Sequence, residues 1–242
     1  MKKEIALIGY GRFGRFISYH LRKRFRVSVV ESSPSIRFEK GIRRISIDEV
    51  ESQRIIFLAV PISRMPHVLD AISSKLQPGT LVIDVCSVKE QPIRWMKSYL
   101  PRHVSILGTH PLFGPESASR GLSGHTIVLC PARIAKSKLR KIVTYLQGIN
   151  VTVQIMTATQ HDRFIASTLF LTQFIGRGLL DLPLHSSQNT TQNFQFLHRI
   201  ATTTGRDTRE LFRDMFHYNR FARTIPDKFI QSLKRTHNQL TT

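Results

Sequence analysis

The segment Glu4–Gly14 reads Glu-Ile-Ala-Leu-Ile-Gly-Tyr-Gly-Arg-Phe-Gly, and it decides the fold of this 242-residue chain. A short apolar run, typical of a buried strand, leads directly into a glycine turn. Apolar side chains then recur at helical spacing as far as Leu21, and a second strand is predicted over Arg26–Val30, just before Glu31. Strand, G-x-G-x-x-G, helix, strand and acid in this order indicate a dinucleotide-binding unit.

The glycines of the turn each have a physical role in this interpretation. Gly9 permits the tight turn, Gly11 lets a pyrophosphate approach the backbone, and Gly14 allows the helix to pack closely on the strand. The N-terminus of the helix then faces the phosphates. The remaining residues of the predicted cofactor turn are Tyr10, Arg12 and Phe13.

Glu31 bears on the choice of cofactor. Its carboxylate can accept hydrogen bonds from the adenosine ribose hydroxyls and would repel a 2′-phosphate, so NAD is favoured over NADP. Ser32, Ser33 and Arg37 follow it and could hold a phosphate, which leaves NADP open.

The composition is ordinary except for charge. Lys and Arg number 36 against 16 Asp and Glu, which gives a formal net charge of +20 at pH 7. The cations are scattered rather than gathered into one arm, so we expect a generally basic surface that favours anionic ligands, and nucleic-acid binding is a distant alternative. No apolar run is long enough for a membrane helix. The chain has the positive start of a signal peptide, but Gly9, Gly11, Arg12 and Arg15 interrupt any long apolar segment, so export is not expected. Two cysteines fit a reducing cytosol, so a cytoplasmic protein is expected.

Strands and helices are predicted to alternate over about 155 residues. The alternation predicts a doubly wound, mainly parallel Rossmann-type α/β sheet over residues 1–156. Residues 32–53 are irregular and carry no prediction. The expected strands are 54–60, 80–85, 105–107, 126–130 and 151–156, and the expected helices are 66–76, one through Trp95 and Leu100, and 132–147.

Ligands of such sheets bind beyond the carboxyl ends of the strands. Three segments besides the glycine turn are predicted there: Ala59-Val60-Pro61, which suits a close pass beside a flat cofactor; Ser87-Val88-Lys89; and Gly108–Ser117. The last reads Gly-Thr-His-Pro-Leu-Phe-Gly-Pro-Glu-Ser and is expected to be a rigid loop that holds His110 just past a strand end.

Residues 157–242 are predicted to form a smaller all-helical domain. A long helix capped by Thr157 or Thr159 should run to about Leu182, and this helix is apolar on most of its faces. Such a helix must be buried, and a homodimer interface is the natural cover. Further helices are predicted over 193–203 and 209–223, joined by a turn at Gly205, and a last helix that frays is expected from about residue 227. We interpret His161 as helix-start structure, with Asp162 favourable near the helix N-terminus.

Several motifs together resemble one family, the prephenate/arogenate dehydrogenases of tyrosine biosynthesis. The matching motifs span roughly residues 4–223 and are Gly9–Gly14, Ala59–Pro61, Asp84–Lys89, Gly108–Pro115, His161–Phe164 and Leu211–Asp214. The resemblance implies a dinucleotide domain, a helical dimerisation domain and a small anionic substrate. It also implies NAD-dependent oxidative decarboxylation of prephenate to 4-hydroxyphenylpyruvate or of arogenate to tyrosine.

The resemblance also implies roles for individual residues. His110 would act on the ring hydroxyl of the substrate with Ser87 beside it. Arg199, in an Arg-Ile-Ala motif, would hold a substrate carboxylate through its planar fork. Gln173 stands where many members carry a histidine, and it can form hydrogen bonds but cannot carry charge. Two further residues of the matching motifs are expected to bind substrate, Lys89 and Thr109, and no metal site is expected.

Two other functions remain open at this level. The first is a non-catalytic, dinucleotide-binding regulatory protein, which Gln173 would suit. The second is another Rossmann oxidoreductase that acts on a small hydroxy or keto acid, because one fold serves many substrates. Nothing in the sequence separates prephenate from arogenate, which differ by a keto and an amino group.

Overall fold

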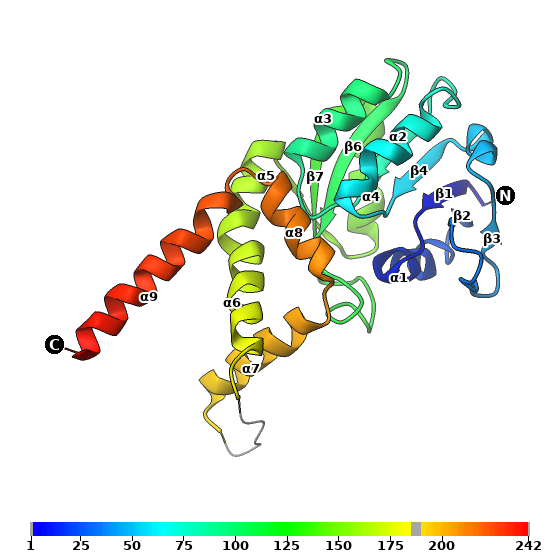
Figure 1. The fold of residues 1–242 in the computed structure, drawn as a ribbon. Helices are drawn as coiled ribbons and strands as arrows, with labels where there is room; N and C mark the ends of the chain where they lie inside the picture. Colours follow the sequence, from blue (N-terminus) through cyan, green and yellow to red (C-terminus); the bar gives the residue numbers. More distant parts are fainter. Residues whose placement is uncertain (1, 185–189, 242) are drawn as a thin grey trace. The chain divides into compact units, whose positions relative to one another are not determined.

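The computed structural model describes residues 2–184 and 190–241 (Figure 1). The chain forms two compact units, Met1–His161 and Asp162–Thr242. The division lies within helix α5 (Ala158–Ile165), whereas the sequence placed it after Met156. Thr157 caps this helix, because its hydroxyl accepts a hydrogen bond from the Gln160 amide while the Gln160 side chain accepts one from the Thr157 amide.

One eight-stranded sheet forms the centre of the first unit in the described part of the chain. Its order is β3-β2-β1-β4-β5-β6-β7-β8, and every neighbouring pair is parallel except β6 and β7. This confirms the predicted mainly parallel, doubly wound sheet. The strands are β1 Glu4–Ile8, β2 Arg26–Val30, β3 Arg43–Arg44, β4 Ile55–Leu58, β5 Leu81–Asp84, β6 Ser105–Pro111, β7 Thr126–Arg133 and β8 Thr152–Ile155.

Helices cover both faces of the sheet because the strands are apolar on both sides. On one face lie α1 (Arg12–Leu21), which packs on β1 and β2, and α4 (Lys136–Gly148), which packs towards β7 and β8. The connections between β4, β5 and β6 contain α2 (Met65–Ser73) and α3 (Glu90–Tyr99). Gly108 of β6 faces α3 so closely that an added Cβ would lie 2.7 Å from the Ile93 side chain.

Strand β6 is longer than expected, and this corrects the placement of His110. The sequence predicted a strand over residues 105–107 followed by a loop, but β6 continues to Pro111. The parallel partner β5 ends opposite Gly108, whereas the antiparallel strand β7 pairs with β6 from Ile106 to Pro111, with His110 opposite Val128. His110 is therefore a strand residue beyond the end of the parallel neighbour, and Pro111 is tolerated as the last residue of the strand.

Strand β7 is also longer than predicted, and helix α4 starts later. Residues 132 and 133 belong to the strand, and the helix begins at Lys136 rather than at Ala132. The guanidinium of Arg133 anchors the strand end, because it donates to the carbonyls of Leu100, Pro101 and Val104.

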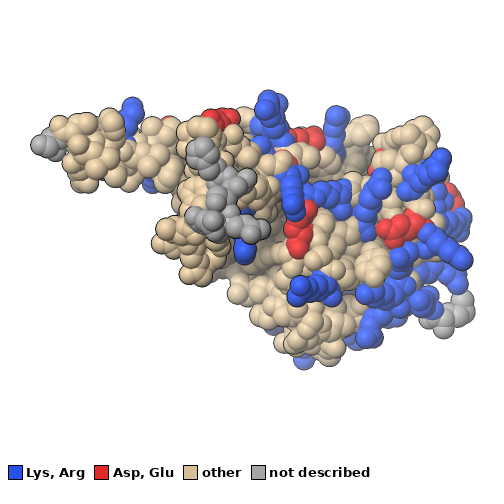
Figure 2. Space-filling view, turned by 90° about the horizontal axis from the view of Figure 1, so that it is seen from below, with Lys and Arg blue, Asp and Glu red and all other residues tan. Residues whose placement is uncertain are grey.

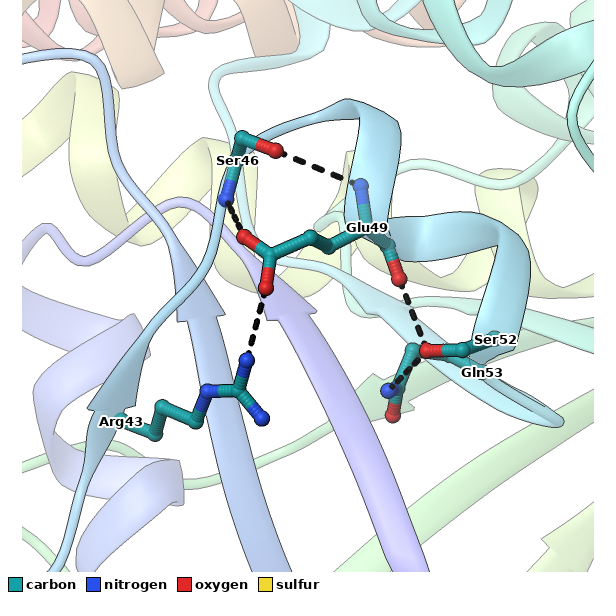
Figure 3. Close-up of polar contacts among 5 residues, drawn as sticks. All are labelled: Arg43, Ser46, Glu49, Ser52 and Gln53. Carbon is teal, nitrogen blue, oxygen red and sulfur yellow. Dashed lines mark hydrogen bonds and ion pairs between the residues drawn. The ribbon is translucent and has the colours of Figure 1, made fainter.

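Residues 32–53 carried no prediction, and within them Glu49 joins Arg43 to Ser46 (Figure 3). The Glu49 carboxylate accepts hydrogen bonds from the Arg43 guanidinium at 2.7 Å and from the Ser46 amide at 2.7 Å. The Ser46 hydroxyl accepts in return from the Glu49 amide at 3.3 Å, so the two residues form a capping box. The box starts the short 3-10 helix Asp48–Ser52, and the Ser46 amide is the main reason that the pKa of Glu49 is lowered.

The second unit is helical, as predicted, but its first long helix is not uniform. A π-helical segment, Ala166–Phe170, separates α5 from α6 (Leu171–Leu180), and Phe170 stacks on Phe212 with ring centroids 5.4 Å apart. The remaining helices are α7 (Gln192–Gly205), α8 (Arg209–Tyr218) and α9 (Ile225–Thr241).

Two details of these helices correct the sequence prediction. Gly205 is the last residue of α7 rather than part of a separate turn. Helix α8 ends at Tyr218 instead of continuing to Arg223, because Asn219 is extended and its side-chain oxygen accepts a hydrogen bond from the Phe221 amide. The last helix expected from about residue 227 is confirmed as α9, from Ile225 to Thr241.

Lys and Arg far outnumber Asp and Glu on the surface, and Figure 2 shows one such face. Cys86 and Cys130 are both buried and free. Within residues 2–184 and 190–241, no helix combines the length and the apolar character needed to cross a membrane.

Candidate functional site

The glycine turn lies between β1 and α1 and has the geometry of a phosphate-binding loop. Gly9 has a φ of +97°, and a Cβ added there would lie 2.5 Å from the Ala59 carbonyl oxygen. An added Cβ on Gly14 would collide with the Gly9 carbonyl, so these positions require glycine. In contrast, no atom lies within 4 Å of the place where a Gly11 Cβ would be, which leaves the backbone open to a ligand.

Helix α1 begins at this turn without a side-chain cap and without an acidic residue in its first turn. The first amides of a helix need partners and carry a partial positive charge. The end of α1 is therefore suited to the pyrophosphate of a dinucleotide.

Glu31 follows β2 directly and lies beside the glycine turn. Its carboxylate accepts hydrogen bonds from the Tyr10 amide at 2.9 Å and the Ser33 amide at 3.0 Å. Burial alone would raise the pKa of Glu31, but the amides of Ser33 and Tyr10 and the hydroxyl of Ser32 lower it overall. A fixed carboxylate at this position suits a ribose diol and disfavours a 2′-phosphate.

The other residues predicted for the cofactor also lie at the carboxyl edge of the sheet. Ala59, just after β4, donates its amide to the Ile8 carbonyl at 2.8 Å and approaches Gly9, while Val60 and Pro61 continue from it. The Arg12 side chain forms an ion pair with Glu116, which joins the glycine turn to the segment after β6.

The end of β5 holds a buried ion pair. The Lys89 ammonium bonds to the Asp84 carboxylate and also donates to the Thr109 carbonyl at 2.7 Å, and both charged side chains have no exposed surface. Burial raises the pKa of the Asp84 carboxyl, and the Lys89 ammonium opposes that rise. The pair therefore joins the ends of β5 and β6.

Ser87 lies between these charged residues in sequence, and its hydroxyl is buried. That oxygen has no hydrogen-bond partner in the described structure. A buried hydroxyl without a partner is costly, so it favours binding of a ligand that supplies one.

His110 is buried, and its Nδ1 lies 2.8 Å from Nε2 of His161. The two rings meet edge to face with centroids 5.0 Å apart. One of the two nitrogens must donate to the other. If Nδ1 of His110 carries the proton and donates to His161, Nε2 of His110 is left as a proton acceptor.

The surroundings keep both rings neutral. Burial lowers the pKa of His110 well below 6.5, and His161 and the Lys89 ammonium lower it further. Burial, followed by Lys89, lowers the pKa of His161 to about 3. At neutral pH His110 is therefore in the form that can accept a proton.

Two of the residues expected to bind substrate are placed differently from that expectation. Thr109 and His110 are consecutive in a strand, so their side chains point to opposite faces of the sheet. The Thr109 hydroxyl donates to the Asp84 carbonyl at 2.7 Å. The Lys89 ammonium is enclosed by Asp84 and the Thr109 backbone, so in this arrangement both residues hold the strand ends together instead of facing a ligand.

Gln173 and Arg199 belong to the second unit. The Gln173 side chain is buried on α6 and donates to the Asp207 carboxylate at 2.6 Å, while its own oxygen has no partner in the described structure. Arg199 is exposed on α7. Helices α6 and α7 are in close contact, since a Cβ on Gly176 would lie 3.1 Å from the Ile200 carbonyl oxygen.

His161 is the functional candidate that the sequence interpretation missed. It was interpreted as helix-start structure, and it does lie in the first part of α5, but its ring contacts the predicted base. The available signal was its place in the His161–Phe164 motif. Asp84 was also missed, although it starts the motif that contains Ser87 and Lys89.

Comparison with known proteins gives a family match. The model of the prephenate dehydrogenase nucleotide-binding domain matches residues 35–155, which is half of the chain and starts after the glycine turn. A second model, the TYRAAT1-like C-terminal domain, matches residues 179–242.

Two similar curated proteins are chloroplastic arogenate dehydrogenases of Arabidopsis thaliana. Arogenate dehydrogenase 1 is 28% identical over 98% of this chain and 39% of its own length. Arogenate dehydrogenase 2 is 30% identical over 89% of this chain and 64% of its own length. The chain thus spans less than two thirds of either relative.

Solved structures share the fold. A prephenate dehydrogenase from Aquifex aeolicus, in complex with hydroxyphenyl propionate and NAD+, aligns over 100% of this chain and 91% of its own with a TM-score of 0.76 at 19% identity. Synechocystis arogenate dehydrogenase aligns over 98% of this chain and 92% of its own with a TM-score of 0.69 at 20% identity.

Proposed function

We propose, since this chain belongs to the prephenate/arogenate dehydrogenase family, that it oxidises and decarboxylates prephenate or arogenate with NAD. The observation that carries the proposal is the neutral, buried His110, whose Nδ1 is bonded to His161 and whose Nε2 is the remaining basic atom. A general base is the group that oxidation of a ring hydroxyl requires from the protein.

In this mechanism Nε2 of His110 accepts the hydrogen bond of the substrate hydroxyl and removes its proton. His161 fixes the ring orientation and the proton position of His110, as the third member of a catalytic triad does for its histidine. Carbon dioxide leaves as the ring becomes aromatic, and the aromatisation drives the reaction. A weak base is therefore sufficient, which agrees with the lowered pKa of His110.

The residues of the glycine turn fit NAD. Gly9 and Gly14 give the close packing, the open backbone at Gly11 and the uncapped α1 suit the pyrophosphate, and Glu31 suits the ribose. Bound NAD would supply the hydride acceptor. The protein's part is to bind it, to orient the substrate and to hold the proton at His110.

The remaining roles in the proposal concern the substrate. The unpartnered hydroxyl of Ser87 would bind the ring hydroxyl together with His110. Arg199 would form two parallel hydrogen bonds to a substrate carboxylate. Gln173, bonded to Asp207, would contribute its free side-chain oxygen to the substrate or hold the helices in place.

Steady-state kinetics test the proposal directly. Formation of reduced cofactor is followed at 340 nm with prephenate and arogenate, each with NAD and NADP. We expect turnover with at least one substrate and preference for NAD. Absence of turnover with all four combinations, in protein that binds NAD by calorimetry, would favour a regulatory dinucleotide-binding protein instead.

We also propose that the helical unit forms a homodimer. Helix α9 leaves Leu233 53% exposed and Leu240 82% exposed, and Phe196 on α7 is half exposed. Leu233 and Leu240 are seven residues apart and so lie on one face of α9, and an apolar face left exposed marks an interaction site. Sedimentation equilibrium tests this, because it should give twice the chain mass of 27.8 kDa.

A further inference from the structure

One face of the sheet in the first unit has an open slot between α1 and α4. Helices α2 and α3, in the connections from β4 to β6, do not line this slot. The chain then returns from β6 to β7 through residues 112–125 without a helix. The slot has a volume of about 1580 Å³ and runs along the strands, from residues before β1 to Phe113 after β6.

The floor of the slot is apolar and incompletely covered. Ile55, Phe57 and Val85 lie on central strands or directly after one, yet they are only half buried. Helix α4, which borders the slot, has no fully buried residue, although its apolar side chains pack towards the sheet. Doubly wound sheets normally bury both faces, so this face lacks one covering element.

The dimensions of the slot correspond to a helix. Strands of four or five residues are about 13–17 Å long, which is the length of about ten helical residues. A helix of that length with a diameter of about 10–12 Å occupies on the order of 1200–1700 Å³. Single small-molecule sites are mostly smaller, about 300–1000 Å³.

The rim of the slot is basic. The cations among its lining residues are Lys2, Lys3, Lys23, Arg24, Arg54, Lys138 and Lys141. The acid among the described lining residues is Glu4, whose carboxylate forms an ion pair with Arg26 at 3.0 Å. The exposed helix α9 of a second copy does not match this rim, because it carries Lys228, Lys234 and Arg235 against Asp227.

We propose that this slot is a docking site for an acidic amphipathic helix of a partner protein. The apolar face of the helix would complete the layer between α1 and α4, and its carboxylates would meet the basic rim. This is the helix-in-groove mode of recognition, in which apolar anchors give the affinity and the charges select the partner. The site is separate from the glycine turn and from His110.

Peptide binding measured by fluorescence anisotropy tests the proposal with the full-length chain. The probe is a labelled 14-residue peptide with leucine at helical spacing on one face and glutamate on the other, and its matched control carries lysine in place of glutamate. We expect the acidic peptide to bind and to become helical, and the basic peptide not to bind.

Charge-reversal variants localise the binding. The double variant Lys138→Glu, Lys141→Glu should weaken the acidic peptide by at least about tenfold, because two attractive pairs become repulsive. The matched control Lys228→Glu, Lys234→Glu on α9 makes the same change in net charge and should leave the affinity within about twofold. A third variant, Ile142→Gln, tests the apolar wall.

Three results would overturn the proposal. Equal weakening by the two double variants would mean attraction to the net charge of the whole chain. Failure of the acidic peptide to bind the native protein at low salt would exclude a helix-binding slot. A change in the oligomeric mass of the Lys138→Glu, Lys141→Glu variant would mean that a second copy covers this face.

Discussion

Replacement of His161 by leucine removes the hydrogen-bond partner of His110 without adding a charge. In the native protein Nδ1 of His110 lies 2.8 Å from His161 Nε2, and both rings are buried. In the variant Nδ1 faces an apolar side chain. The His110 proton then moves to Nε2, where it can be hydrogen-bonded by water or substrate, and the base form is lost.

The size of this effect follows from the burial of the pair. A buried donor left without a partner costs about 1–3 kcal/mol, which corresponds to about a 5- to 150-fold change in the population of the productive tautomer. Since His161 has no exposed surface, we expect the upper part of this range in kcat. KM should change little, because in the proposed mechanism a substrate carboxylate is bound by Arg199 and not by His161.

A matched variant separates orientation from packing. His161→Gln keeps an oxygen that can accept the Nδ1 proton, so kcat should remain within about threefold of the native value.

The assay is the rate of NADH formation between pH 5 and 9, with urea unfolding midpoints to exclude misfolding. Native kcat in folded His161→Leu would refute the orienting role. Equal impairment of the leucine and glutamine variants would mean that His161 only packs against its neighbour.

Four other predictions follow from the same region. His110→Asn should lower turnover by about 10²–10⁴ while NAD affinity measured by calorimetry stays unchanged, and near-native turnover would remove His110 as the base. Glu31→Ser should improve the ratio of NADP to NAD affinity by about tenfold, because a charge that repels the 2′-phosphate is lost, and an unchanged ratio would refute that role. Lys89→Met should lower the free energy of unfolding by about 3–5 kcal/mol, since it leaves Asp84 buried and unpaired, whereas addition of Asp84→Asn should recover most of the loss. The pKa of His161 is about 3 in the folded state, below its unfolded value, so the unfolded chain binds more protons and the free energy of unfolding falls as pH falls below about 6.5. Between pH 7.5 and 5.0 the native protein should therefore lose about 2 kcal/mol more than His161→Gln, measured by urea titration. The same pH dependence of the free energy of unfolding in both proteins would contradict this.

The sequence predicted the elements that local chemistry determines. The bounds of β1 and β2 and the position of α1 agree with the prediction, because a buried apolar run, a glycine turn and a helical repeat each extend over a few adjacent residues. The capping box of Ser46 and Glu49 was equally local and readable as S-x-x-E, but the surrounding residues show no strand or helix period to draw attention to it.

The extent of β6 could not be predicted from local sequence. Prolines and glycines in Gly108–Ser117 favour a loop, and residues 108–111 are extended because β7 pairs with them from about twenty residues later. The extended backbone of residues 108–111 also decides which side chains lie on the same face of the sheet. A loop would have allowed Thr109 and His110 to face one ligand together, whereas a strand places them on opposite sides.

The base and its partner show where prediction from sequence ends. His110 was identifiable from its motif, but His161 lies 51 residues away on a different element, and no spacing rule links a strand residue to a helix residue. Lys89 lowers the pKa of both rings from a third element. A charged residue in a motif suggests a ligand contact, yet here its charge is satisfied by Asp84 and acts on the histidines through space. The proposed chemistry of the site thus depends on the arrangement of three elements, in which the residue proposed to meet the substrate, His110, is kept neutral by its neighbours.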